Sequence, residues 1–129
     1  MKAILVIALL VLALFVVKRL IGGPGIRPVE ANRRVGGGTA ILVDVREPGE
    51  WAGGVASTAY LLPMSDLRGG RKLWGPILER YRDKEILVYC ASGTRSAMVA
   101  GILRREGFQA SNAGSYGAWR GAGLPIKTP

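Results

Sequence analysis

The hydrophobic positions of this chain form one long apolar run, followed by short apolar segments that alternate with polar and amphipathic ones. Residues 40–45 (AILVDV) and 86–89 (ILVY) are apolar at nearly every position, and each run is short. This pattern is typical of strands that are buried on both faces of a parallel sheet. Residues 59–62 predict another short strand and residues 108–113 an edge strand. We expect residues 40–45 to be a central strand.

The segments between these strands have helical features. Residues 73–81 place their large apolar side chains on one helical face, and residues 96–106 form a helical pattern that ends at a glycine. Shorter helices or turns are expected over 28–34 and 115–120, and a polar surface loop over 65–72. Strands that alternate with helices predict an α/β domain with a small parallel sheet flanked by helices.

The long apolar run lies at the N-terminus. Residues 3–17 contain no polar side chain, as in a signal-peptide core or a short membrane span. No small-residue cleavage site follows, so we expect one retained transmembrane helix over 1–21, a Gly/Pro linker over 22–27 and a domain over 28–129. Basic residues after the run predict that this domain lies at the cytoplasmic face of a membrane: Lys18, Arg19, Arg27, Arg33 and Arg34.

Composition narrows the function classes. The formal net charge is +9, and more than half of the excess lies in residues 1–37, where anionic lipid headgroups would attract it. The basic residues form no dense run interleaved with aromatic ones, so no nucleic-acid partner is expected. The chain has no histidine and a single cysteine. We therefore expect no internal disulfide, no metal, no cofactor and no nucleophile that depends on a histidine base.

The single cysteine, Cys90, begins a short loop between the strand over 86–89 and the helix over 96–106. Gly93 allows the loop to curve, so that the amides of residues 91–96 converge on the sulfur and form an anion-binding nest. The helix N-terminus and Arg95 add positive charge. Each effect favours a thiolate and lowers the thiol pKa below its usual value of about 8.5. The polar residues that follow argue against an inert buried cysteine.

The spacing between Cys90 and Arg95 favours one type of chemistry. Four residues separate them, one fewer than in the loop of Cys-dependent phosphatases, and the tighter ring suits a single sulfur atom better than a phosphoryl group. Three segments resemble a single-domain rhodanese, with a match over roughly 28–126: LVDVREPGEW at 42–51, CASGTRS at 90–96 and GSYGAWRGAGLP at 114–125. The preceding apolar run resembles a bacterial membrane-anchored subgroup of that family.

This resemblance implies a sulfurtransferase of the thiosulfate sulfurtransferase type. Cys90 would be the nucleophile and would carry sulfur as a persulfide, taken from a small anionic donor such as thiosulfate. An external acceptor, either cyanide, a thiol or a protein, would remove the sulfur, because the chain has no second cysteine. Asp44 and Arg46 would support the site. The residues implied in binding the substrate are Ala91, Ser92, Gly93, Thr94, Arg95 and Ser96.

Several of these residues have a structural alternative. A strand-end aspartate such as Asp44 more often accepts loop amides than takes part in chemistry, and Arg46 fits either role. Glu47 is expected to be solvated, and the two tryptophans of the motifs, Trp51 and Trp119, are expected to pack. Small polar residues such as Ser92 and Thr94 are also common in tight loops.

Two other functions remain open at this stage. One is a membrane-anchored interaction module whose cysteine is vestigial or regulatory. The other is a phosphatase-like or arsenate-reductase-like enzyme. The chain also departs from the family over 53–58, where it has GGVAST in place of a sequence close to GHIPGA. We expect an altered local turn there.

Overall fold

The computed structural model describes residues 1–22 and 25–129. The helices are α1 (Lys2–Gly22), α2 (Pro28–Gly36), the 3₁₀ helix η1 (Pro48–Gly53), α3 (Met64–Leu67), α4 (Trp74–Arg80), α5 (Thr94–Arg105) and α6 (Tyr116–Gly121). The strands are β1 (Ala40–Asp44), β2 (Val55–Ala56), β3 (Tyr60–Leu61), β4 (Glu85–Cys90), β5 (Ala110–Ser115) and β6 (Ile126–Lys127).

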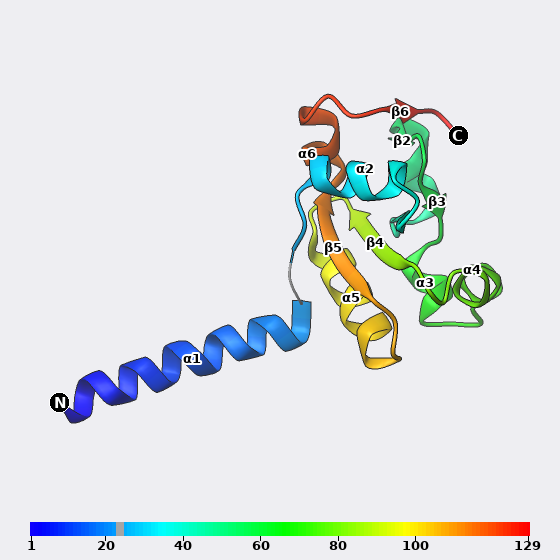
Figure 1. The fold of residues 1–129 in the computed structure, drawn as a ribbon. Coiled ribbons are helices and arrows are strands. Elements are labelled where there is room, and N and C mark those ends of the chain that lie inside the picture. The colour runs from blue at the N-terminus through cyan, green and yellow to red at the C-terminus, as the bar shows by residue number, and fades with distance from the viewer. Residues whose placement is uncertain (23–24) are drawn as a thin grey trace.

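The main sheet contains four parallel strands in the order β3-β1-β4-β5. Figure 1 labels β3, β4 and β5 of this sheet. β1 and β4 pair in register from Ala40 opposite Glu85 to Asp44 opposite Tyr89. The expected parallel α/β domain is therefore confirmed, with β1 in the interior of the sheet and β5 at its edge. Because parallel strands end at a common edge, Asp44 and Cys90 lie at the same side of the sheet.

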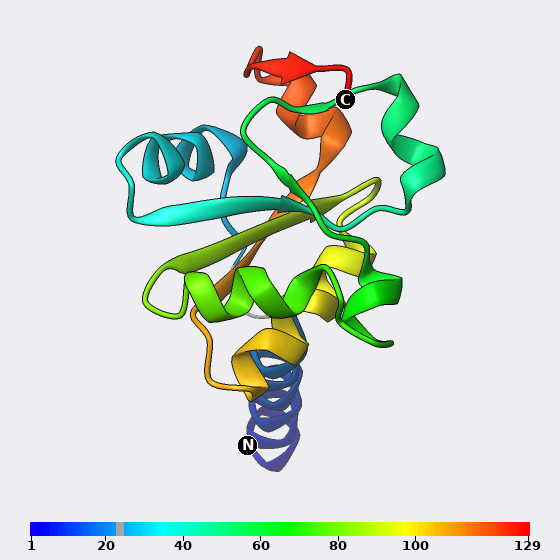
Figure 2. The ribbon, with the colours of Figure 1, turned by 90° about the vertical axis from the view of Figure 1, so that its right-hand side faces the viewer.

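Helices cover both faces of the sheet (Figure 2). Successive side chains of β1 alternate: Ile41 and Val43 pack with Trp74 and Leu103 on the face of α3, α4 and α5. Leu42 packs with the residues of α2 and α6 on the other face. All of β1 is buried, which explains its continuous apolar sequence.

The structure differs from the predicted elements in three places. Part of the expected loop over 65–72 is helical, because α3 begins directly after Pro63. The segment over 53–58 contains β2, which pairs with β6 in a small antiparallel sheet that local patterning did not reveal. α5 begins at Thr94, two residues earlier than predicted, so Arg95 belongs to its first turn.

The predicted transmembrane anchor over 1–21 requires correction. Among the residues described, no helix is long and apolar enough to cross a membrane. The apolar side chains described in α1 cover residues 3–17, which at about 1.5 Å per residue span roughly 22 Å, less than a hydrocarbon core of about 30 Å. The expectations of a membrane-anchored subgroup, a membrane partner and a cytoplasmic membrane face depended on that span and are corrected with it.

The predicted linker over 22–27 is described in part. Its residues 23 and 24 lie outside the described residues. Gly25 forms a parallel bridge with Asn112, and the Ile26 N–H donates a hydrogen bond of 2.9 Å to the Asn112 carbonyl oxygen. These contacts pair backbone groups at the outer edge of β5.

Candidate active site

Cys90 lies at the carboxyl end of β4, and a three-residue loop connects it to α5. Gly93 adopts the left-handed conformation, with φ of 92°, which turns the chain back toward the sulfur. Because α5 begins at Thr94, the amides of its first turn have no intrahelical acceptor. The loop and the helix N-terminus therefore surround Sγ with donors.

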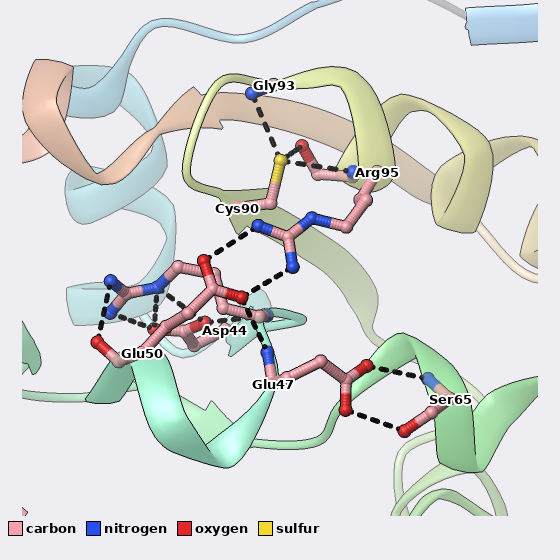
Figure 3. A network of polar contacts seen from close by, with 9 residues as sticks. Asp44, Glu47, Glu50, Ser65, Cys90, Gly93 and Arg95 are labelled. Atoms are coloured by element: carbon pink, nitrogen blue, oxygen red, sulfur yellow. Dashed lines mark hydrogen bonds and ion pairs between the residues drawn. The ribbon is translucent and has the colours of Figure 1, made fainter. Parts of the chain in front are cut away.

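The sulfur is fully buried and accepts hydrogen bonds from two residues. The Gly93 N–H lies 3.0 Å from Sγ (Figure 3). Ser96 contributes its N–H at 3.4 Å and its hydroxyl at 3.3 Å. Burial raises the pKa of the Cys90 thiol, but the hydrogen bonds from Ser96 and Gly93, together with the nearby Ser92 amide, outweigh it, and the pKa falls below its ordinary value. The result is a desolvated sulfur prepared for negative charge.

The predicted ring of amides is thus formed in part. Gly93 and Ser96 bind the sulfur directly, whereas the amides of Ala91, Thr94 and Arg95 are not among the described donors to Sγ.

The side chain of Arg95 is engaged in an ion pair within the protein. Its guanidinium forms a bidentate ion pair with Glu50 of η1, with nitrogen–oxygen distances of 2.6 and 2.8 Å (Figure 3). The hydrogen bond from Arg95 lowers the pKa of Glu50 to about 2, and Glu50 raises the pKa of Arg95 in turn. The expected anion-binding cation is therefore neutralised by a carboxylate in this structure. Sequence reasoning missed Glu50 because it lies 45 residues from Arg95.

Asp44 and Arg46 form a buried ion pair beside the site. Arg46 Nη2 lies 2.8 Å from Asp44 Oδ2, and the Arg46 amide donates to Asp44 Oδ1 at 2.9 Å. The same guanidinium donates to the Glu50 carbonyl at 3.2 Å and the Gly54 carbonyl at 2.7 Å. The pair thereby ties the middle and the C-terminal end of η1 to the sheet, and η1 presents Glu50 to Arg95. None of the described contacts of Asp44 or Arg46 reaches Cys90.

The remaining motif residues that the sequence analysis considered have mainly structural contacts. Glu47 is bound, not simply solvated: its carboxylate accepts from the amide and hydroxyl of Ser65 at 3.1 and 2.7 Å. The Ser92 hydroxyl donates to Thr94 Oγ1 at 3.2 Å in the exposed part of the loop. Trp119 is buried and stacks on Tyr89, as expected of a packing residue.

Asn112 of β5 is a second residue that sequence reasoning missed. Its amide contacts Ser96, Gly93 and Gly114, which places it directly behind the Cys90 loop. Asparagine in a predicted edge strand carries no local signal of such a role, because the contact depends on the pairing of β5 with β4.

The structure is that of a small parallel α/β domain with a cysteine in the loop between a strand and a helix. The cysteine is buried, and its sulfur accepts hydrogen bonds from the loop and from the helix N-terminus. Within this class of domains, the model of the rhodanese-like domain matches residues 27–122, and the chain belongs to this family.

Three similar proteins illustrate the relationship. The chain is 34% identical over 98 residues to a putative mitochondrial thiosulfate sulfurtransferase of Schizosaccharomyces pombe, which covers 69% of this chain and 67% of that protein. It is 34% identical over 93 residues to a sulfurtransferase of Allochromatium vinosum, with coverage of 69% and 79%. The crystal structure of a rhodanese-related protein from Thermoplasma volcanium has a TM-score of 0.68 at 27% identity and covers 81% of this chain and 98% of that one.

Proposed function

We propose that this chain, through the domain of residues 28–129, transfers sulfane sulfur that is carried as a persulfide on Cys90. The observation that carries the proposal is the buried Sγ with donors from Gly93 and Ser96. Such a site stabilises a sulfur anion without a neighbouring base. The family and the names of two relatives, a putative thiosulfate sulfurtransferase and a sulfurtransferase, support the same chemistry.

The proposed reaction has two displacements at sulfur. The Cys90 thiolate attacks the outer sulfur of thiosulfate, a new S–S bond forms, and sulfite leaves with the electron pair of the broken bond. An acceptor thiolate or cyanide then attacks the outer sulfur of the persulfide. The product is a new persulfide or thiocyanate, and the Cys90 thiolate is regenerated. Thiosulfate and cyanide serve here as test reagents for a small anionic donor and an external acceptor.

The loop supplies the binding groups for this sequence of steps. In this proposal the amides of residues 91–96 would bind the outer sulfur, with those of Gly93 and Ser96 already directed at Sγ, and the exposed hydroxyls of Ser92 and Thr94 would meet the incoming donor. Arg95 binds the sulfonate part of the donor, for which it exchanges Glu50 for the incoming anion. Asp44 and Arg46 keep η1 in place during this exchange.

Mass spectrometry of the full chain tests the proposal. After treatment with thiosulfate, Cys90 is expected to gain the mass of one sulfur atom, and cyanide is expected to remove it with formation of thiocyanate. The Cys90→Ser variant should do neither. An unchanged mass in the wild-type protein, or equal turnover in the serine variant, would instead favour an interaction module with an unused cysteine.

A further inference from the structure

Asn112 lies on β5 directly opposite Val88 of β4, on the face covered by α5. Two residues beyond, the register between the strands shifts, so that Cys90 pairs with Ser115. The side chain of Asn112 therefore lies behind the Cys90 loop, at the point where the sheet meets the N-terminus of α5. Ser111, its neighbour in the strand, faces the opposite side of the sheet because side chains alternate.

Hydrogen bonds hold the Asn112 amide in one orientation. Its Oδ1 accepts the Ser96 hydroxyl at 2.7 Å and the Gly114 N–H at 2.9 Å. Its Nδ2 donates to the Gly93 carbonyl at 2.9 Å. A flipped amide would place Nδ2 against the Gly114 N–H and Oδ1 against the Gly93 carbonyl. The network therefore defines which end of the amide faces Ser96.

These contacts link Asn112 to both residues that donate to Cys90. Ser96 Oγ, 2.7 Å from Asn112 Oδ1, is also 3.3 Å from Sγ. A hydroxyl has one proton to donate, so Oδ1 and a charged sulfur compete for it. At Gly93, the bond from Nδ2 orients the 93–94 peptide and holds the residue whose N–H lies 3.0 Å from Sγ.

We infer that Asn112 is a positioning residue, which sets the Ser96 hydroxyl and the Gly93 peptide for stabilisation of the sulfur anion on Cys90. This role deepens the proposed sulfur transfer and rests on it, because the persulfide is the anion to be stabilised. Asn112 acts through Ser96 and Gly93, and none of its described bonds reaches the sulfur itself.

The charged side chains near Cys90 are paired with one another and do not replace the hydrogen bonds that Asn112 makes to Ser96 and Gly93. Arg95 of α5 is the nearby cation, and it is paired with Glu50 of η1. Asp44 and Arg46 at the end of β1 neutralise each other. From β5, the group that faces the loop is the neutral Asn112 amide, so a charge introduced there is not compensated by an existing partner.

The Asn112→Asp variant tests the inference in the full chain. It keeps an acceptor for Ser96, replaces the donor to Gly93 by a second acceptor and adds a negative charge two hydrogen bonds from the sulfur. We measure the rate of Cys90 alkylation by iodoacetamide against pH. The midpoint of the profile is expected to rise by about one pH unit, which slows alkylation by up to about tenfold at pH values below both midpoints.

Two further variants test whether the effect of Asn112 on the sulfur passes through the Ser96 hydroxyl. In a Ser96→Ala background, Asn112→Asp should shift the midpoint by less than half as much, since the connecting hydroxyl is gone. Ser111→Ala, on the same strand but the opposite face, should leave the profile unchanged. An equal shift with and without the Ser96 hydroxyl, or no shift, would overturn the inference.

A variant without a new charge covers the case in which Asn112→Asp does not fold, which thermal unfolding would reveal. Asn112→Ala is expected to slow alkylation about two- to threefold near neutral pH, because the Gly93 peptide, whose N–H donates to the sulfur, loses the hydrogen bond that orients it. A wild-type rate in this folded variant would equally contradict the inference.

Alkylation needs no sulfur donor, so the outcomes for the two proposals separate. A shifted alkylation profile in a protein that forms no persulfide would reject the sulfur transfer and retain the positioning of the thiolate. Persulfide formation together with unshifted alkylation profiles would retain the sulfur transfer and reject the positioning role of Asn112.

Discussion

Substitution of Glu50 by glutamine addresses how Arg95 works. In the structure, Arg95 must leave a bidentate partner before it can bind an anionic donor. Glutamine keeps the size of the side chain but removes its charge and one of its two acceptors. We expect Glu50→Gln to bind thiosulfate more tightly than the wild-type protein does.

The magnitude follows from the geometry of the pair. Distances of 2.6 and 2.8 Å and the low pKa of Glu50, about 2, indicate a strong interaction. The side chains are 29% and 35% exposed, however, so solvent screening limits the pair to about 1 kcal/mol. Release of that constraint corresponds to a decrease of about fivefold in KM for thiosulfate.

Steady-state kinetics of the thiosulfate–cyanide reaction measures this effect. The difference from wild type should shrink as ionic strength rises, because salt screens partly exposed charges. Glu106→Gln is the matched control: it also removes a bidentate carboxylate from an arginine, Arg71, but at the far end of α5, and the KM of this variant should stay at the wild-type value. An unchanged or higher KM in Glu50→Gln would refute the reasoning and show that Glu50 serves to hold Arg95 in its working position.

Three further outcomes are expected. Arg95→Ala should raise KM for thiosulfate about tenfold or more while it changes use of an uncharged persulfide donor much less; equal losses would remove anion recognition. Arg46→Met should lower the free energy of unfolding by about 3–5 kcal/mol in urea titrations, because it leaves the Asp44 carboxylate buried without its partner; a loss below about 1 kcal/mol would contradict that account. The lowered pKa of Glu50 predicts that its pairing stabilises the fold above pH 4.5 and loses this effect as the pH falls through about 2. The unfolding free energies of wild type and Glu50→Gln should therefore differ at neutral pH and converge in acid. A difference that stays constant with pH would show that protonation of Glu50 is not coupled to folding stability.

The order of strands and helices was largely predictable. Short apolar runs such as 40–45 are confined to strands that are covered on both faces, so their burial is encoded locally. The helix over 73–81 was also predicted closely, with α4 at Trp74–Arg80. By contrast, β2 and β6 are two residues long and exist because they pair with each other, which no local pattern reports.

The start of α5 illustrates a smaller error with a functional consequence. Thr94 and Arg95 are not helix-breaking, and the conformation of Gly93 places the helix start immediately after it. As a result, Arg95 projects from the first turn toward η1 and meets Glu50. A prediction that left residue 95 in the loop offered no reason to search for that partner.

The sequence alone determined the alternation of strands and helices and the position of the Cys90 loop, because strand burial and the conformational freedom of Gly93 are short-range properties. Tertiary structure decided which residues complete the site. Glu50 contacts Arg95 from η1, and Asn112 contacts Gly93 from β5. Both contacts form only when the parallel sheet places β1, the strand before η1, and β5 on either side of β4. The N-terminal run shows the same division: its apolar character is plain from the sequence, whereas the described residues contain no helix with the length and apolarity of a membrane span. The polarity of each residue is known from the sequence, but the partner of a charged group or an amide depends on how distant segments pack.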